Sequence, residues 1–264
     1  MEAGSERPAH HVQSLERGLA VIKAFGSGAA RLTLSDVAKS TGLTRAAARR
    51  FLLTLADLGY VRSEGRYFTL TARVLELGYA YLSSLSLSEV VQPHLERLSA
   101  EVHESCSVSV LDGTDIVYVA RVAVSRIMTV SINVGTRFPA HATSMGHVLL
   151  AGLDEPALEA YLRDAEFERL TSHTLTAPEA LRTELAAVRG QGWALVDQEL
   201  EEGLRSVAAP IRDPHGTVVA AVNISTQAHR TGQDAVRTSL LPSLLATAER
   251  IEADLAVAPS ARVS

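Results

Sequence analysis

Apolar residues recur every three or four positions through the first part of the chain, which is the spacing of amphipathic helices. The segment SLERGLAVIKAFG is the first example, and Gly26 is a natural stop after it. We expect the buried face of this first helix to consist of Leu15, Leu19, Ile22 and Phe25.

Two further helices follow, separated by a tight turn. Ser35 can cap the shorter helix, and Gly42 closes it. Thr44 is the expected N-cap of the longer helix, and Gly59 ends it. The longer helix carries an apolar stripe that would hold it on its domain, made of Phe51, Leu52, Leu55 and Leu58.

The pattern then changes to alternation. The segment YVRSEGRYFTL predicts a β-hairpin with a tight turn at Glu64-Gly65. Helix, short helix, turn, longer helix and hairpin in this order form a winged helix-turn-helix. We therefore expect such a domain over residues 12–71, preceded by a disordered tail over residues 1–11.

Charged residues are distributed unevenly along the chain. The formal net charge of the chain is −5, yet residues 1–85 hold 11 Lys and Arg against 7 Asp and Glu, and residues 86–264 hold 14 against 23. A basic segment in an acidic chain predicts a polyanionic partner for that segment. Two solvated surfaces of unequal sign are the alternative.

The longer helix has the composition of an element that enters a DNA groove. Its first turns carry Ala46, Ala47 and Ala48, whose small side chains allow close approach to a major groove about 12 Å wide. Arg45 and Arg49 can reach base edges or phosphates from the same turns. With the wing included, the expected DNA-contacting residues are Ser35, Thr44, Arg45, Ala46, Ala47, Arg49, Arg50, Arg62 and Arg66.

Two alternatives stay open for this domain. Arg50 can pair with Asp57 or Glu64 instead of with DNA. A small helical subdomain of this kind can also bind another protein. The arginines at the start of the longer helix and on the wing favour double-stranded operator DNA as the partner.

The connection to the rest of the chain is itself helical. Residues 72–86 are expected to form a linker helix, and a second helix follows from about Leu87 to Val102. An apolar face on this connection needs a partner, and a second copy of the chain is the simplest one. DNA readers of this type dimerise to span two half-sites, so we expect a homodimer.

Residues 87–258 are predicted to form an α/β domain with an antiparallel-rich sheet. The segment SCSVSVLDGTDIVYVARV alternates on both sides of an Asp112-Gly113 turn, as a hairpin does. One helix is expected from Met145-Gly146, a second is expected with Thr176 as its cap, and a long helix closes the chain. The fold class of the whole chain is therefore predicted as α+β.

The sequence contains no motif of an enzyme or a metal site. It has no Gly-x-Ser-x-Gly elbow, no phosphate-binding loop and no paired His or Cys ligands. Cys106 lies in an alternating strand, which favours packing over nucleophilic chemistry. A loop gathers carboxylates that can bind a cation or exchange protons but are more typical of a solvated surface, namely Asp197, Glu199, Glu201 and Glu202. We expect a domain that binds a small molecule, with no cofactor and no metal, rather than an enzyme.

Composition favours a cytoplasmic protein. A single cysteine leaves no internal disulfide. No apolar run approaches the roughly 18 residues that a membrane span needs, and the polar N-terminus lacks the apolar core of a signal peptide.

Two sets of motifs resemble one protein family. The segments SLERGLAVIKAF, TLSDVAKSTGLTRAAARRFLLTLADLGYV and TLTARVLELGYAYL are similar to the N-terminal domain of IclR-type transcriptional regulators. The segments VGTRFPAHATSMGHVLLAGL and GLRSVAAPIRDPHGTVVAAVNIS resemble the effector domain of the same family. The segment ATSMGHVLLA is most similar to the PcaR/PcaU/PobR branch, which regulates catabolism of protocatechuate and 4-hydroxybenzoate.

The resemblance implies a GAF-like effector domain with a pocket on one face of its sheet, and often a dimer of dimers. Members that take small oxo-acids tend to have a small residue where Met145 stands, so a ligand of another shape is implied here. The implied effector-binding residues are Ile127, Val130, Ser144, Met145, Gly146, Asp197, Leu204, Ser206, Asn223 and Ser225.

These residue types suit a small aromatic carboxylic acid. Apolar side chains can clamp a ring, while hydroxyl, amide and helix N-terminal N–H groups receive a carboxylate. Arg121, Arg126 and Arg137 are possible partners of that carboxylate. Core packing for Met145 and a satisfied amide for Asn223 stay open as alternatives.

We therefore expect a ligand-responsive regulator of aromatic-acid catabolism. A regulator of another small carboxylic acid is the first alternative. A metabolite-binding or enzymatic domain with a protein-contacting winged helix is the second.

Overall fold

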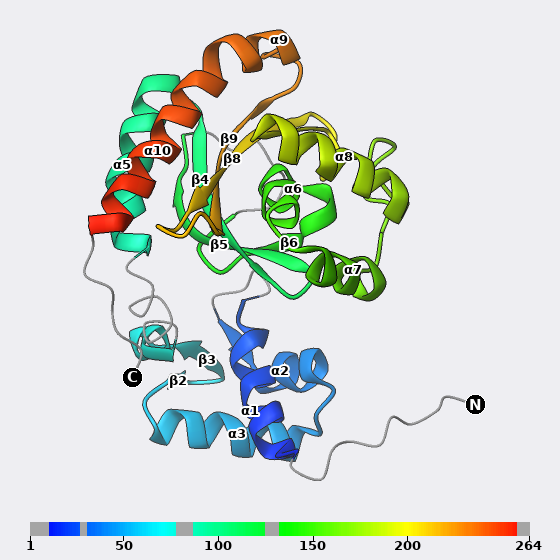
Figure 1. Cartoon of the computed structure of the whole chain (residues 1–264). Coiled ribbons are helices and arrows are strands. Elements are labelled where there is room, and N and C mark those ends of the chain that lie inside the picture. Colours follow the sequence, from blue (N-terminus) through cyan, green and yellow to red (C-terminus); the bar gives the residue numbers. More distant parts are fainter. Residues whose placement is uncertain (1–10, 27–30, 78–86, 125–131, 258–264) are drawn as a thin grey trace. The chain divides into compact units, whose positions relative to one another are not determined.

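The computed structural model describes residues 11–26, 31–77, 87–124 and 132–257. The chain divides into two compact units, residues 1–83 and 84–264 (Figure 1). The predicted fold class, with a winged helix-turn-helix and an antiparallel sheet domain, is confirmed. Of the expected linker helix, a 3-10 turn η1 (Ala72–Val74) and helical residues 75–77 are present at the start, and residues 78–86 lie outside the described residues.

The N-terminal unit contains three helices and a small sheet. The three strands are antiparallel in the order β1-β3-β2, and the first of them was not expected from the sequence. The elements are α1 (Gln13–Ala24), β1 (Leu32–Thr33), α2 (Leu34–Thr41), α3 (Arg45–Asp57), β2 (Val61–Glu64) and β3 (Tyr67–Leu70).

Side-chain caps fix the ends of the two central helices. Thr33, and not Ser35, caps α2: Thr33 Oγ1 accepts the N–H of Asp36 at 3.3 Å, and the Asp36 carboxylate accepts the N–H of Thr33 at 2.9 Å. Gly42 ends α2 with φ 66°, a left-handed conformation that favours glycine. Thr44 caps α3 as predicted, since its Oγ1 accepts the N–H three residues later at 3.2 Å.

The predicted apolar face of α1 is only partly correct. Val21, Ala24 and Phe25 are buried, whereas Leu15 and Leu19 are 63% and 46% exposed. The core of this unit meets only the C-terminal half of α1, where the helix packs on α2 and α3. The N-terminal half of α1 therefore presents apolar side chains at the surface of its own unit.

Helix α3 also differs from expectation at two positions. Ala48 is fully buried beside Leu52 and Leu55, so it is a core residue and cannot enter a groove. Leu58 is 52% exposed, because α3 ends at Asp57 and Leu58 is its C-cap.

The C-terminal unit is a six-stranded sheet with helices on both faces (Figure 1). The strand order is β6-β5-β4-β9-β8-β7, and every pairing is antiparallel. The elements are α5 (Leu87–Val102), β4 (Ser105–Asp112), β5 (Asp115–Val122), β6 (Arg137–Pro139), α6 (Ser144–Ala151), α7 (Glu155–Asp164), α8 (Pro178–Gln191), β7 (Ala194–Asp197), β8 (Leu204–Arg212), β9 (Val218–Gln227), α9 (Gln233–Ala235) and α10 (Leu241–Val257), with a 3-10 turn η2 (Ala140–Ala142) and a π-helical turn η3 (Val236–Leu240).

Each face of the sheet has its own apolar core. Helices α5 and α10 pack together on one face, and α6 packs on the other, with α8 against it. The apolar face of α5 is buried within the unit, since Val91, Leu95 and Leu98 are fully covered. The expectation that a second chain covers this helix is therefore wrong for residues 87–102.

Two helix boundaries need correction. The helix predicted from Met145 is two helices, because α6 ends at Ala151 with Gly152 as its C-cap, and Asp154 caps α7. Thr176 does not cap α8. Its hydroxyl accepts a hydrogen bond from Arg169 at 3.2 Å, and the N-cap position is occupied by Ala177.

Candidate functional site

The start of α3 presents an exposed basic surface. Arg45, Arg49 and Arg50 are exposed, as is Ala46, while Ala47 is half-buried. Within the described part of the chain, no hydrogen bond or ion pair engages the three guanidinium groups. These cations are therefore available to an external anion, which suits the predicted contact with DNA.

Arg50 does not pair with either carboxylate proposed for it. Glu64 is instead bound by Arg62, with 2.8 Å between Arg62 Nε and Glu64 Oε1, and both side chains are exposed. An exposed pair of this kind contributes little stability, so Arg62 can exchange Glu64 for a phosphate.

The wing contains a cluster that the sequence did not reveal. The guanidinium carbons of Arg31 and Arg66 lie 5.5 and 4.9 Å from the centre of the Tyr67 ring, and Arg66 Nη2 donates to Tyr67 Oη at 2.7 Å. Arg31 reaches this ring because β1 pairs with β3 and places Thr33 opposite Tyr67. The signal for this cluster is Arg31, a cation immediately before β1 in the sequence. Ser35 is exposed on α2, and its contact with DNA stays a prediction.

The C-terminal unit contains a small cavity between the N-terminus of α6 and the sheet. The cavity volume is about 20 Å³, which is room for roughly one water molecule. Its lining consists of Tyr118, Ala142, Thr143, Ser144, Met145, Val196, Leu200, Leu204, Ser206, Asn223 and Ser225. Six of the predicted effector residues are among these, and they come from α6, β8 and β9.

Two atoms in this lining are buried without a hydrogen-bond partner among the described residues. They are Ser144 Oγ and Asn223 Oδ1, and the amide nitrogen of Asn223 donates to Ser225 Oγ at 3.1 Å. Buried polar atoms are normally paired, because an unpaired one loses its hydration without compensation. The two atoms therefore point to a polar ligand, one able to accept from a hydroxyl and donate to an amide oxygen.

The start of α6 adds further donors. Thr143 caps the helix by accepting the N–H of Gly146 at 3.0 Å, which leaves the N–H groups of Ser144 and Met145 in the first turn. These groups and the helix dipole favour a carboxylate at this end of the cavity.

A row of polar residues crosses the sheet beside the cavity. Ser107 on β4 lies opposite Asn223 on β9 and opposite Arg121 on β5. Arg121 Nη1 donates to Ser107 Oγ at 3.1 Å, while Arg121 Nε is buried without a partner in the described structure. Burial lowers the pKa of Arg121 from its ordinary value, a sign that the cation has lost hydration.

The other two arginines suggested as carboxylate partners have different positions. Arg137 is bound by Asp112 and Asp115 at the edge of the sheet. Arg126 lies outside the described residues, as do Ile127 and Val130. Arg121 is thus the described arginine with unused bonding capacity next to the cavity.

Family models match both units. The model described as IclR helix-turn-helix domain matches residues 14–65, and the model described as Bacterial transcriptional regulator IclR C-terminal matches residues 79–253. The chain belongs to the IclR family. Members of this family are DNA-binding transcriptional regulators, so the prediction that the chain is a regulator and not an enzyme is confirmed.

Relatives of this IclR-family chain include regulators of aromatic catabolism. The chain is 48% identical over 234 residues to the Pca regulon regulatory protein of Pseudomonas putida, covering 88% of this chain and 80% of the relative. A crystal structure from Rhodococcus sp. RHA1 is 62% identical, with a TM-score of 0.83 over 94% of this chain and 99% of the other. An IclR homologue of Microbacterium hydrocarbonoxydans, solved as a complex with 4-hydroxybenzoate, is 28% identical, with a TM-score of 0.82 over 93% of this chain and 100% of the other.

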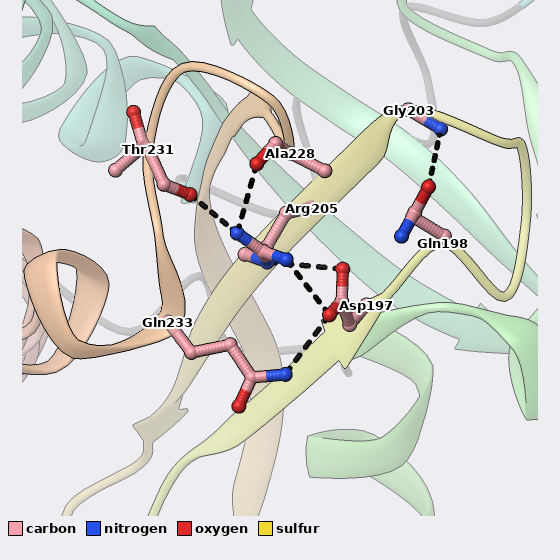
Figure 2. A network of polar contacts seen from close by, with 7 residues as sticks. All are labelled: Asp197, Gln198, Gly203, Arg205, Ala228, Thr231 and Gln233. Atoms are coloured by element: carbon pink, nitrogen blue, oxygen red, sulfur yellow. Dashed lines mark hydrogen bonds and ion pairs between the residues drawn. The ribbon is translucent and has the colours of Figure 1, made fainter.

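Two predicted effector residues of the IclR-type chain do not contact the cavity. Asp197 binds Arg205 instead, with 2.8 Å between Asp197 Oδ2 and Arg205 Nη2 (Figure 2). Successive strand residues point to opposite faces of the sheet, so Val196 lines the cavity and its neighbour Asp197 points to the other face. Gly146 is needed for a different reason: a Cβ there would lie 2.0 Å from the carbonyl oxygen of Ala140.

Sequence reasoning also missed several residues of the lining. Tyr118, Thr143, Val196 and Leu200 were not predicted to lie there. The alternation of β5 and β7 contained the information for Tyr118 and Val196, but the face of each strand was unknown.

The remaining candidate chemistry is the single cysteine and the acidic and histidine side chains. Burial raises the pKa of the Cys106 thiol to about 12, so the reactive thiolate is absent near neutral pH. No group of three or more His, Cys, Asp or Glu side chains that could hold a metal is found in the ranges that the structure describes. In the same ranges, no helix has the length and apolar character of a membrane span.

Proposed function

We propose that this protein regulates genes for the catabolism of aromatic acids and that a small aromatic carboxylic acid, of the protocatechuate or 4-hydroxybenzoate kind, is its effector. The effector binds at the cavity between α6 and the sheet. It changes the affinity of the winged helix-turn-helix for operator DNA, and the protein acts in the cytoplasm.

Ser144 Oγ and Asn223 Oδ1, which have no hydrogen-bond partner in the described part of the chain, carry this proposal. A hydroxybenzoate has a carboxylate that accepts from Ser144 Oγ and from the first N–H groups of α6, and a phenolic hydroxyl that donates to Asn223 Oδ1. Tyr118, Met145 and Leu204 supply apolar contact for the ring between these ends. Arg121 stands on the same polar row and can complete the charge balance.

Binding of an operator is the second half of the proposal. Arg45 and Arg49 on α3 enter the major groove, and Arg62 and Arg66 on the wing contact the backbone or minor groove. A two-fold operator requires two copies, and the exposed apolar stripe on α1 supports a homodimer or a dimer of dimers. Its members are Val12, Leu15 and Leu19, which are 58%, 63% and 46% exposed.

One experiment tests both halves on the full-length protein. An operator is first selected from a pool of random DNA, and its affinity is then measured with and without 4-hydroxybenzoate or protocatechuate. We expect the effector to shift operator affinity by about 5–150-fold, the usual range of allosteric coupling. Pyruvate serves as the small oxo-acid comparison and should have no effect.

Variants separate the two halves. Arg45→Ala with Arg49→Ala should abolish selection of the operator and leave calorimetric binding of 4-hydroxybenzoate intact. Ser144→Trp should abolish calorimetric binding of 4-hydroxybenzoate and leave selection of the operator intact. Thr183→Trp, on the exposed side of α8, is the matched control and should change neither measurement. Unchanged calorimetry for Ser144→Trp would refute this effector site, and an unchanged operator shift for the arginine pair would refute the groove assignment.

A further inference from the structure

The cavity cannot accept an aromatic ring as it stands. Its volume is about 20 Å³, whereas an engineered cavity known to bind benzene has a volume of about 150 Å³. Most of the lining belongs to α6 and to the strands, which form the core. The part free of that core is residues 198–203, which connect β7 to β8 and contribute Leu200. We call these residues the lid loop, and effector binding requires it to move.

Several bonds hold the lid loop in its present conformation. Gln198 has φ 67°, a left-handed conformation that is strained for this residue type. The N–H of Gln198 donates to Leu204 O at 2.8 Å, and Gln198 Oε1 accepts the N–H of Gly203 at 3.0 Å. Thr171 and Thr174 donate their hydroxyls to the carbonyls of Gln198 and Glu199, each at 2.7 Å.

The lid loop is flanked by a partly buried ion pair on the opposite face of the sheet. Leu204 and Ser206 point to the cavity, so Arg205 between them points to the face covered by α5 and α10. The Arg205 side chain is 9% exposed and donates to both oxygens of Asp197, at 3.0 and 2.8 Å. Asp197 immediately precedes the lid loop and Arg205 lies two positions after its end, so a displacement of the loop alters their geometry.

Arg205 also donates hydrogen bonds to a segment distant in the sequence, residues 228–233 (Figure 2). Its Nη1 donates to the carbonyl of Ala228 at 3.1 Å and to the carbonyl of Thr231. Gln233, the first residue of α9, donates to Asp197 Oδ2 at 2.9 Å. Residues 228–233 lead through α9 and η3 into α10, which packs on α5.

A second ion pair anchors the same segment from the other side. Arg230 binds Glu104, which is buried and also accepts from Thr226 Oγ1 at 3.0 Å. Residues 228–233 are thus bound at two places. One is Glu104, directly before β4, and the other is the pair Asp197 and Arg205 on β7 and β8, the two strands that flank the lid loop. The N–H of Ala228 also donates to the carbonyl of Gly203 in the lid loop at 2.8 Å, so this segment is attached to the loop directly as well as through Arg205.

We propose that Arg205 is a positioning residue that transmits displacement of the lid loop to residues 228–233 and so to α10. This inference deepens the proposed function and depends on it for the identity of the effector. Arg205 does not touch the effector, so its role is to convert movement on the cavity face into movement on the α5–α10 face.

The inference is tested on the full-length protein by a substitution in the lid loop, with amide hydrogen exchange measured over residues 228–235. Gln198→Gly removes the side-chain bond to Gly203 and relieves the strained φ, which loosens the lid loop. In a chain that keeps Arg205, we expect exchange over residues 228–235 to rise about tenfold, the equivalent of one or two lost hydrogen bonds. In a chain that also carries Arg205→Lys, Gln198→Gly should change exchange over residues 228–235 less than about twofold.

Lysine is the appropriate replacement for Arg205. It keeps a charge beside Asp197, so the protein is expected to fold, but one ammonium group cannot reach the carboxylate and both carbonyls together. Arg189→Lys is the matched control, because Arg189 also donates to two carbonyls, of Ala151 and Leu153, at 2.8 and 3.1 Å. That control should leave the response of residues 228–235 to Gln198→Gly unchanged.

The outcomes for the inference and for the proposed function are distinct. An equal rise over residues 228–235 in the Arg205 chain and in the Arg205→Lys chain would overturn the inference, since the signal would then pass by another route. Adding 4-hydroxybenzoate should protect residues 204–206 and 223–225, and absence of that protection counts against the proposed effector alone. The effect of Gln198→Gly is compared between the Arg205 chain and the Arg205→Lys chain without any effector. It therefore tests the role of Arg205 whether or not 4-hydroxybenzoate binds.

Discussion

Ser144 on α6 and Asn223 on β9 each place one buried polar atom without a partner among the described residues in the lining of the same cavity. Neither atom stabilises the fold by hydrogen bonding, so the burial of each atom costs the free energy of its lost hydration. Such a cost is expected where a ligand supplies the missing bonds.

Replacing Ser144 by Ala should therefore separate stability from binding. The variant loses an unpaired hydroxyl and gains helix propensity, so we expect its free energy of unfolding to be unchanged or higher by up to about 1 kcal/mol. Its affinity for 4-hydroxybenzoate should fall about tenfold, since a hydrogen bond to a carboxylate is lost. Denaturant unfolding and calorimetry provide the two measurements.

Thr143→Ala is the control for that experiment. It removes the cap of α6 and should lower the free energy of unfolding by about 1 kcal/mol. If Ser144→Ala were destabilised to the same extent, the Ser144 hydroxyl would have a structural partner, and its assignment to the effector would fail.

The alanines of α3 offer a matched pair. Ala48 is fully buried and Ala46 is exposed, two positions apart on one helix. Ala48→Leu should lower the free energy of unfolding by about 1–3 kcal/mol through overpacking. Ala46→Leu should leave stability within about 0.5 kcal/mol but weaken operator binding, because the added side chain meets the groove.

These substitutions are read by thermal unfolding and by fluorescence anisotropy of labelled operator. Full operator affinity with Ala46→Leu would show that this face of α3 does not enter the groove.

Arg31 should contribute to DNA binding through the wing. If its guanidinium neutralises one phosphate beside Tyr67, Arg31→Ala should reduce the slope of log affinity against log salt by about 1. Arg31→Lys keeps the charge and should preserve most of the slope. An unaltered slope for Arg31→Ala would limit Arg31 to packing on the Tyr67 ring.

Glu199 on the lid loop should make stability depend on pH. Burial raises its pKa from 4.5 to about 7, and repulsion from Glu184 and Asp197 acts in the same direction. The folded chain then keeps a proton that the unfolded chain releases, so the stability gained by protonation is complete below pH 4.5 and is lost as pH rises towards 7.

The comparison with Glu199→Gln isolates this effect. Between about pH 5 and pH 8, the wild type should lose about 1 kcal/mol relative to the variant, after allowance for partial exposure of the side chain. That corresponds to about 2–4 °C in Tm. Parallel Tm curves for the two proteins would show that Glu199 is ionised throughout.

Local signals explain why the DNA-binding unit was largely predictable. The cap at Thr44, the stop at Gly42 and the hairpin at Gly65 each depend on neighbours within four residues. The buried side of α1 was not predictable, because it depends on how much of the helix its neighbours cover. Leu15 and Leu19 fit an amphipathic pattern equally well whether they face a core or a surface.

The cavity was harder to predict for a geometric reason. Alternation shows that Val196 and Asp197 face opposite sides, but it does not show which side holds the ligand, and a shift of one residue exchanges them. Arg205 binds carbonyls 23 and 26 positions later, at Ala228 and Thr231, and no local pattern encodes such contacts. Six residues that the family resemblance implies line the cavity from α6, β8 and β9, whereas the carboxylate of Asp197 is bound by Arg205.

The strand order of the C-terminal unit has a consequence for synthesis of the protein. Its central strands β4 and β9 pair residues as distant in sequence as Ser107 and Asn223, so the sheet cannot close until nearly the whole chain has left the ribosome. The N-terminal unit needs only the first 83 residues and can fold long before. A chain that stops before β9 would therefore contain the N-terminal unit but lack the strand that supplies Asn223 and Ser225 to the cavity.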